Sequence, residues 1–369
     1  MSYNQICLHL IYITYIVVLN YKSGGCEGLY RDLVRRSYGH QAVPSVKHCG
    51  FARQKGPCVA LIGIQSHPDF HERRRLLRES WIKYSTPGLH FVFILAQPTS
   101  PPILSEATLR EEFMAYGDVV YLNISEVNCR VTGLKSHAFF QWASTLGSGR
   151  FAFIGKADDD EVVNPYQLRL MLTMHPRKDK AFIGRALPFY FGPYLAKEPK
   201  FPFPTKFLGM MYIMSYDLVA VIGGLSYREQ LGQVVTRIKS QGLDKVAARV
   251  RRSIGEDRVL SAFVELKVAS VEWFKTLPCQ FHNHPGYLTF TERETKQTLY
   301  NYTKRTAVVH KLKTVPSLKL ALGELLPHIE GMALDCAEWV EGSEGYEQRP
   351  YLAQPSAQCQ SWNMPLDTC

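Results

Sequence analysis

Short unbroken runs of apolar residues alternate along the chain with longer segments in which apolar residues recur every three or four positions. Unbroken runs are typical of strands buried on both faces of a parallel sheet, and the wider spacing is typical of helices. The pattern predicts strands at residues 58–64, 91–95, 119–122 and 151–154. It predicts helices between them at residues 73–81, 104–116 and 134–146. In the last helix, one predicted face carries Leu134, Ala138, Trp142 and Leu146.

This alternation predicts an α/β fold with a mostly parallel central sheet and helices on both faces. Ligands of such sheets bind beyond the carboxyl ends of the strands, so polar residues that follow a strand are the first candidates for a site. The folded body is assigned to residues 57–313. Residues 22–56, rich in Gly, Arg, Ser and His, are predicted to form a stem. Residues 314–369 contain several prolines and form a C-terminal extension that is either loosely structured or docked on the core.

The first segment, residues 1–21, contains an uncharged apolar run from Ile6 to Tyr21. As a helix this run is about 24 Å long, whereas a bilayer core is about 30 Å thick, so it is a marginal membrane span. It is an uncleaved anchor, a cleaved signal or the buried first element of a cytosolic protein. We favour the anchor, which makes the membrane a predicted partner.

Composition and charge exclude several classes of protein. A chain of 369 residues with 46% hydrophobic residues is not disordered, and its net charge of +10 is spread along the chain, so nucleic acid is not a predicted partner. The nine cysteines lack the paired spacing of a zinc site. Eight of them lie outside the apolar run, an even number compatible with disulfides, and Asn123 and Asn301 begin glycosylation sequons. Both features favour the secretory lumen.

Three consecutive carboxylates, Asp158, Asp159 and Asp160, closely follow the predicted strand that begins at Phe151. Charges at the end of a buried strand are costly unless a cation balances them. A hard divalent cation prefers oxygen ligands and leaves positions open for phosphate oxygens. The pattern favours such a site, and the alternative is a solvated turn or a helix cap before Asn164.

Several blocks, in the same order, resemble the β-1,3-glycosyltransferase family, which contains β-1,3-galactosyltransferases, β-1,3-N-acetylglucosaminyltransferases and Fringe-type enzymes. The blocks and the family patterns that they resemble are Arg75–Trp81 (R-x-x-I-R-x-T-W), Phe91–Leu95 (the family's next strand), Glu112 with Tyr116–Val119 (E-x-x-x-Y-G-D-I), Val131–Ser136 (L-T-x-K-T), Lys156–Asn164 (K-x-D-D-D-x-F-V-N), Phe203–Ser215 (Y-P-x-Y-x-x-G-x-G-Y-V-x-S) and Glu256–Asp257 (E-D-V). The resemblance covers residues 58–285.

The resemblance implies a GT-A type, Rossmann-like nucleotide-sugar fold, a UDP-sugar donor, Mn²⁺ or Mg²⁺, and inversion at the anomeric carbon. It implies transfer of a hexose, galactose or N-acetylglucosamine, in β-1,3 or a similar β linkage. The acceptor would be a hydroxyl of a glycan on a glycoprotein or glycolipid. It also implies a single-pass type II Golgi membrane protein whose catalytic domain is luminal.

The resemblance also assigns roles to particular residues. Asp257 is the predicted base, and Glu256 orients it or binds the acceptor. The predicted metal ligands are Asp158, Asp160 and a histidine, for which His282 is preferred over His284. The predicted donor contacts are Arg75, Arg78, Lys135, Lys156, Asp158, Asp159 and Gly209.

Structural alternatives stand beside several of these roles. Glu256 and Asp257 would otherwise only cap a helix over residues 258–265. Arg75 and Arg78 are one turn apart and are predicted to face the same side, but Arg78 would equally form a salt bridge to an acidic residue at a strand end. The two lysines would otherwise simply pair with carboxylates, and Trp81 is predicted to lie in the core.

The chain departs from the family pattern near the predicted base. Arg258 stands where the family has valine, and the glycine expected three residues further on is replaced near Leu260–Ser261. In the G-x-G block Gly209 is kept, but Met211 replaces the second glycine. These departures leave open a non-catalytic, glycan-binding member of the family. A metal-dependent nuclease or phosphotransferase is a weaker alternative, because it needs paired metal sites.

Overall fold

The computed structural model describes residues 58–86, 88–97, 106–125, 134–175, 179–188, 203, 205–253, 256–276, 280–283, 302 and 305–341. The predictions for residues 1–57, the sequon at Asn301 and the side chains of His282 and His284 lie outside this description. Within the described residues, no helix is long and apolar enough to cross a bilayer.

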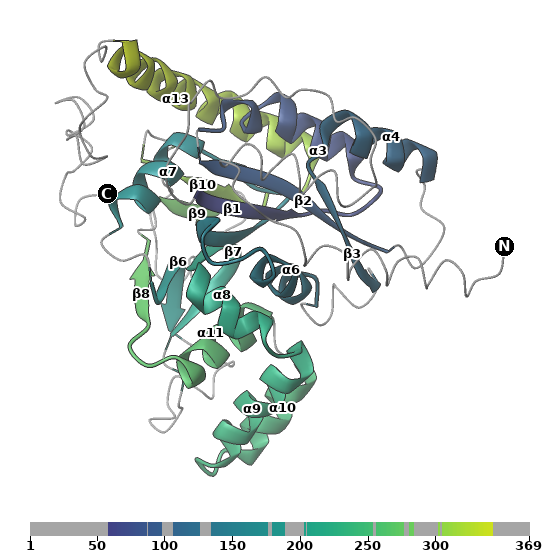
Figure 1. The fold of residues 1–369 in the computed structure, drawn as a ribbon, viewed down its shortest axis with the longest axis vertical. Helices are drawn as coiled ribbons and strands as arrows, with labels where there is room; N and C mark the ends of the chain where they lie inside the picture. The colour runs from purple at the N-terminus through teal and green to yellow at the C-terminus, as the bar shows by residue number, and fades with distance from the viewer. Residues whose placement is uncertain are drawn as a thin grey trace.

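A seven-stranded sheet forms the centre of the molecule, in the order β3-β2-β1-β4-β7-β6-β8 (Figure 1). Its strands are β1 (Cys58–Gln65), β2 (Leu89–Gln97), β3 (Val119–Ser125), β4 (Phe151–Asp158), β6 (Ala181–Pro188), β7 (Thr205–Ser215) and β8 (Glu272–Lys275). Pairing is parallel except where β7 pairs with β4 and β6. The four predicted strands and the mostly parallel sheet are therefore confirmed.

Helices cover both faces of this sheet (Figure 1). One face carries α3 (His71–Glu79), α4 (Glu106–Tyr116), α7 (Pro165–Met174) and α13 (Val315–Glu341), and a short 3₁₀ helix, η1 (Ile82–Tyr84), follows α3. The other carries α6 (Leu134–Ser144), α8 (Tyr216–Gly223), α9 (Tyr227–Lys239), α10 (Asp244–Ser253) and α11 (Glu256–Lys267). Successive strand residues enter opposite cores, because side chains alternate across a sheet. Leu61 packs in one core and Ile62 in the other.

Helix α6 packs through a wider face than the one predicted. Leu146 is buried, and Leu134, Ala138 and Trp142 are half-buried against the same core, but Phe139, Phe140 and Ala143 are the fully buried residues. The aromatic side chains set the orientation, because the ring of Phe139 lies over Gly63, where a Cβ atom would stand 2.6 Å from it. A glycine in β1 thus allows close approach of α6 to the sheet.

A second, three-stranded sheet has the order β5-β10-β9, with β5 (Val162–Val163), β9 (Phe281–Asn283) and β10 (Val308–His310). It joins the segment after β4 to residues about 150 positions further along the chain. Helix α13 follows β10 and packs its Leu318, Leu322 and Leu325 into the same core as α3 and α7. The beginning of the C-terminal extension is therefore docked on the core rather than loosely structured.

Candidate active site

The acidic segment, Asp158–Glu161, lies at the carboxyl end of β4 and is largely buried. The backbone N–H of Asp159 donates to the carbonyl oxygen of Gln65 at 3.1 Å, which holds the turn against the end of β1. The side chains of Asp158, Asp159 and Asp160 are 29%, 11% and 3% exposed. The solvated-turn alternative is therefore wrong. The helix cap is also a different residue, since Asn164 Oδ1 accepts the hydrogen bond that caps α7.

Strand β10 brings His310 to this segment. Val309 of β10 lies opposite Val162 of β5, and β5 follows the acidic segment directly. The backbone N–H of Leu312 also donates to the carbonyl oxygen of Asp160 at 3.0 Å. The pairing of two short buried strands therefore places a histidine beside carboxylates that are far from it in the sequence.

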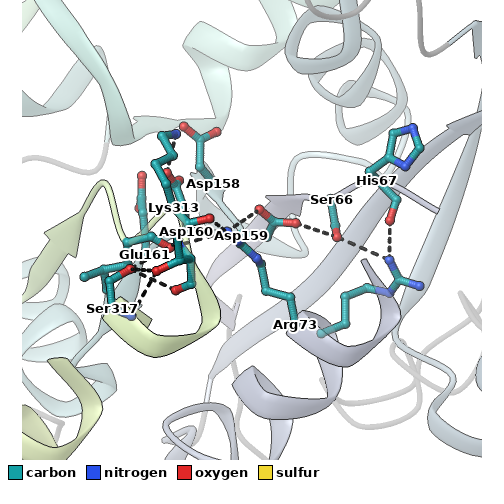
Figure 2. Close-up of polar contacts among 12 residues, drawn as sticks. Ser66, His67, Arg73, Asp158, Asp159, Asp160, Glu161, Lys313 and Ser317 are labelled. Atoms are coloured by element: carbon teal, nitrogen blue, oxygen red, sulfur yellow. Dashed lines mark hydrogen bonds and ion pairs between the residues drawn. The ribbon is translucent and has the colours of Figure 1, made fainter. Parts of the chain in front are cut away.

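The imidazole of His310 faces three carboxylates at once. Its Nε2 lies 3.5 Å from Asp158 Oδ2 and 3.7 Å from Asp160 Oδ1. It lies 4.0 Å from Glu161 Oε1. We call these four residues, Asp158, Asp160, Glu161 and His310, the acidic centre; Figure 2 shows its three carboxylates close together.

Burial and neighbouring charges shift the pKa values of the carboxylates in the acidic centre in opposite directions. Burial raises the pKa of Glu161 well above its ordinary value, and the neighbouring Asp158 adds to the rise. Burial also opposes ionisation of Asp158, but Lys156 and His310 outweigh it and hold the pKa of Asp158 below its ordinary value. Both carboxylate oxygens of Asp160 are buried without a hydrogen-bond partner in the described part of the chain, although Lys313 forms an ion pair with one of them.

The acidic centre fits a hard divalent cation. One ligand atom from each of Asp158, Glu161 and His310 can be chosen so that all three lie within 4.8 Å of one another. Carboxylate oxygens suit Mg²⁺ and Mn²⁺, and an imidazole nitrogen is a common additional ligand of transition metals. The two oxygens of Asp160 without hydrogen-bond partners supply a further donor group that a cation would satisfy.

Lys156 connects the acidic centre to the pair of acids at the start of α11. Its Nζ lies 2.6 Å from Asp158 Oδ1 and 3.7 Å from Glu256 Oε1, and it donates to the carbonyl oxygen of Gly209. Burial would lower the pKa of Lys156, but Asp158 and Glu256 outweigh burial and raise it. The ammonium is therefore a fixed positive charge between two carboxylates, as the pairing alternative predicted.

Glu256 is partly buried, and polar side chains surround its carboxylate. Ser136 Oγ donates to Glu256 Oε1 at 3.3 Å, and Gln65 Nε2 donates to the same serine at 2.5 Å. Burial raises the pKa of Glu256, Asp257 adds to the rise, and Lys156 opposes it.

Asp257 stands beside the one glycine of the G-x-G block that the chain keeps. A Cβ atom on Gly209 would lie 4.0 Å from Asp257 Oδ2, so the glycine leaves room next to this carboxylate. Asp257 Oδ1 accepts the backbone N–H of Arg258 at 2.9 Å. Ser261, which replaces the family's glycine, donates to the carbonyl oxygen of Asp257 and accepts the N–H of Phe207. The departure therefore adds a link that fixes the start of α11 to β7.

The second departure has a structural consequence as well. Met211 is fully buried in the core, and its backbone N–H donates to Glu161 Oε1 at 3.0 Å. The methionine side chain packs in the core that also contains Val162 and Val309, and its backbone supports the acidic centre. Lys135, predicted as a donor contact, is buried and donates to the carbonyl oxygen of Ser66 at 2.8 Å.

The arginines of α3 differ from the prediction, because Arg75 and Arg78 do not face the same side. Arg75 is 48% exposed and pairs with Glu72 and Glu79 on its own helix. Arg78 is 8% exposed and forms two hydrogen bonds, both of 2.7 Å, to Asp118. The salt-bridge alternative for Arg78 is therefore the one that the contacts support.

Arg74, which the sequence interpretation did not select, is fully buried. It forms two hydrogen bonds to Glu112, at 2.8 and 2.6 Å, and Arg78 donates to the same carboxylate at 2.7 Å. We call Arg74, Arg78, Glu112 and Asp118 the arginine network. Trp81 lies nearby in the core, edge-on to Phe91, as predicted.

The arginine network reaches the acidic segment through Ser66. Arg74 Nη1 donates to Ser66 Oγ at 3.3 Å, and Ser66 Oγ donates to Asp159 Oδ2 at 2.7 Å. Arg73 lies 3.5 Å from Asp159 Oδ1 on the other side, as Figure 2 shows. Burial still raises the pKa of Asp159 to about 6 against these partners. Two side chains of the protein, Ser66 and Arg73, thus hold the two carboxylate oxygens of Asp159 in place.

His310 is the functional residue that the sequence interpretation missed. The preferred candidate, His282, lies on β9 next to β10, where Val309 is its partner in the register. The signal for His310 was present, because Ala307–Val309 is a short apolar run that ends in a histidine. This is the same strand-end pattern that identified Asp158.

Residues 72–234 match the family model for galactosyltransferases. Over this range the chain is therefore similar to the galactosyltransferase family. The acidic segment lies inside the matched range, whereas Asp257 and His310 follow it.

Curated relatives agree with this assignment at modest identity. The chain is 29% identical over 135 residues to "Probable beta-1,3-galactosyltransferase 13" of Arabidopsis thaliana, covering 34% of this chain and 38% of that protein. It is 30% identical over 190 residues to N-acetyllactosaminide beta-1,3-N-acetylglucosaminyltransferase 2 of Homo sapiens, covering 49% and 46%. The chain spans less than half the length of the curated relatives that it matches.

Similar solved structures include the galactosyltransferase LgtC in complex with donor and acceptor sugar analogues. That match has 9% sequence identity and a TM-score of 0.40, and it covers 72% of this chain and 96% of that chain.

Proposed function

We propose that the chain is an inverting, cation-dependent hexosyltransferase of GT-A type that uses a UDP-sugar donor. The observation that carries the proposal is the acidic centre. In a chain similar to the galactosyltransferase family, it gathers three carboxylates and a histidine at the carboxyl end of β4, with two oxygens of Asp160 lacking hydrogen bonds. This is the edge of the sheet where ligands of α/β proteins bind.

The donor side of the site would be held by the acidic centre. Asp158, Asp160 and His310 would hold Mn²⁺ or Mg²⁺, with Glu161 as a further carboxylate behind them. A bound cation supplies Lewis-acid stabilisation of the charge that develops on a leaving diphosphate. Asp158 is the most exposed of the three aspartates, so it is the one placed to meet a ribose hydroxyl or a water as well.

Asp257 would take the proton of the acceptor hydroxyl as that hydroxyl attacks the anomeric carbon. Lys156 and Gly209 lie between this carboxylate and the acidic centre, which separates the base from the donor side. Such a separation suits an inverting displacement, in which the attacking and leaving groups lie on opposite faces of the sugar.

The transferred sugar would be galactose or N-acetylglucosamine, and the acceptor a glycan hydroxyl that receives a β-1,3 or similar β linkage. The names of the curated relatives include both transferase activities.

The location would be the Golgi membrane, with a single-pass type II anchor and a luminal catalytic domain. Cys58 is disulfide-bonded, which is typical of an oxidising compartment. Asn123, the first residue of one sequon, is exposed on β3.

Hydrolysis of a panel of UDP-sugars by the purified protein, with Mn²⁺ and with chelator, tests the proposal without a known acceptor. We expect Mn²⁺-dependent release of UDP from one sugar of the panel, which would identify the donor. Binding of UDP without hydrolysis of any donor or transfer to any glycan would favour the non-catalytic, glycan-binding alternative. Failure to bind UDP would contradict the proposal.

Asp257→Asn tests the assignment of the base. The substitution keeps the shape of the side chain but removes the proton acceptor, so transfer should fall about 10³-fold while the affinities for Mn²⁺ and UDP stay unchanged. Steady-state kinetics and calorimetric titration measure the two effects separately. Near-normal transfer would leave Glu256 and Asp257 with only their role in the first turn of α11.

A further inference from the structure

Lys313 is a cation placed on the acidic centre by a part of the chain that none of the sequence blocks includes. Its Nζ forms an ion pair with Asp160 Oδ2, and the lysine side chain is 58% exposed while that of Asp160 is 3% exposed. An exposed ammonium therefore covers a buried carboxylate from the solvent side. Figure 2 shows Lys313 above Asp160 and Glu161.

The backbone of Lys313 is fixed although its side chain is exposed. Arg73 Nη2 donates to the carbonyl oxygen of Lys313 at 2.6 Å. The next residue, Thr314, exchanges hydrogen bonds with Ser317 and closes the first turn of α13. The ammonium of a lysine sits on a flexible four-carbon side chain. It can therefore move while the backbone of Lys313 stays in place.

Asp160 cannot keep this partner unchanged when a divalent cation binds. The cation and the ammonium carry like charge, and both would approach the same small carboxylate. Donor phosphates would bring further negative charge to the cation, within reach of a lysine on a fixed backbone.

We propose that Lys313 is a movable counter-ion: it neutralises Asp160 while the acidic centre is empty and contacts the diphosphate of the donor once the cation is bound. The inference rests on the proposed function and adds a diphosphate-binding residue to it. Lys313 competes with the cation in the absence of nucleotide and cooperates with it in the presence of nucleotide. One substitution should therefore change the two affinities in opposite directions.

The test compares Lys313→Met with the wild-type protein, using electron paramagnetic resonance of free Mn²⁺ without nucleotide. Removal of a partly exposed ion pair should tighten Mn²⁺ binding about two- to fivefold. At saturating Mn²⁺, loss of a charge-assisted contact to phosphate should weaken UDP binding about tenfold in calorimetric titration. A merely structural role would weaken both affinities together.

Two matched variants complete the experiment. Lys313→Arg keeps the positive charge and should restore both affinities to within about twofold of wild type. Lys319→Met removes an exposed charge from α13, six positions further on, and should change neither. If wild type binds Mn²⁺ and Lys313→Met binds it equally well or more weakly, the counter-ion proposal is wrong and the proposed function stands. If neither protein binds Mn²⁺, both proposals are wrong.

Discussion

The arginine network and the acidic centre are both built from buried charges, yet the partners of those charges differ. In the arginine network, two guanidinium groups face two carboxylates through hydrogen bonds of 2.6 to 2.8 Å. In the acidic centre, three carboxylates face one imidazole, and the lysine that pairs with Asp160 is 58% exposed. The first arrangement is closed to other partners. The second is held in part by an exposed cation that a ligand could displace, which fits the proposed cation site.

The difference also corrects an interpretation that rests on residue type alone. Arginines near a predicted nucleotide site suggest phosphate contacts, but Arg74 and Arg78 use their donors on Glu112 and Asp118. Whether a charged side chain is already paired within the protein therefore says more about its role than its residue type does. A buried pair with every donor used is structural, whereas a buried group with donors or acceptors left over is available for binding.

Asp160→Ala should have the largest effect on function. The substitution removes the most buried of the three aspartates, so Mn²⁺-dependent UDP binding should be lost and transfer should fall by about 10³-fold or more. Calorimetric titration of UDP with and without Mn²⁺ measures the loss, and circular dichroism checks the fold. Retained UDP binding with the same dependence on Mn²⁺ would remove Asp160 from the cation site.

Arg78→Met should have the largest effect on stability. It leaves Asp118 buried without its bidentate partner, and breaking a buried pair from one side costs about 3–5 kcal/mol. Urea denaturation gives the free energy of unfolding. Arg75→Met is the matched control, because Arg75 is half-exposed on the same helix and should leave the midpoint of unfolding unchanged. Equal effects of the two substitutions would contradict the assignment of the arginine network.

His310→Gln should have a smaller effect than loss of Asp160, because the carboxylates remain. Mn²⁺ affinity should fall by at least about 10- to 100-fold, which is the usual loss when a residue that only supports a metal ligand is replaced. The free energy of unfolding in chelator should change little by comparison. An unchanged Mn²⁺ affinity would show that another residue, such as His282, supplies the imidazole.

Glu265 provides the smallest test, since it is a single half-buried carboxylate outside both clusters. Its Oε2 is buried without a hydrogen-bond partner in the described residues, and burial raises its pKa from 4.5 to about 7. The unfolded chain therefore loses this proton at lower pH than the folded protein. The free energy of unfolding should decrease as pH rises from about 4.5 to about 7 and then level off.

Glu265→Gln removes that dependence. Above pH 7 the variant should be more stable than wild type by about 1 kcal/mol, a value that allows for partial solvent exposure of the group. Below pH 4.5 the two proteins should be equally stable. Parallel pH profiles of wild type and variant would contradict the raised pKa.

Much of the fold could be predicted from local pattern. Strands β1 to β4 are unbroken apolar runs because both of their faces are buried, and the helices between them keep a helical period. The full burial of Phe139 in α6 could not be predicted, because its contact with Gly63 depends on the neighbouring strand. The docking of α13 could not be predicted for the same reason, because its apolar residues are buried only where the helix packs against α7.

The candidate site was predictable where it is contiguous and not where it is assembled. Asp158 to Asp160 stand together at the end of one strand, so the sequence alone points to them. His310 and Lys313 reach the same place only through the pairing of β10 with β5. The difference in burial between Arg74 and Arg75 likewise depends on tertiary contacts. The side chain of Arg74 contacts Glu112, whereas that of Arg75 faces solvent.

Anomalous diffraction at the manganese absorption edge, from crystals grown with MnCl₂ and UDP, tests the central claim most directly. The account predicts one strong peak between the side chains of Asp158, Asp160 and His310, next to the diphosphate of UDP. A peak at another place, or bound UDP with no peak in the acidic centre, would contradict the claim that the acidic centre is the cation site.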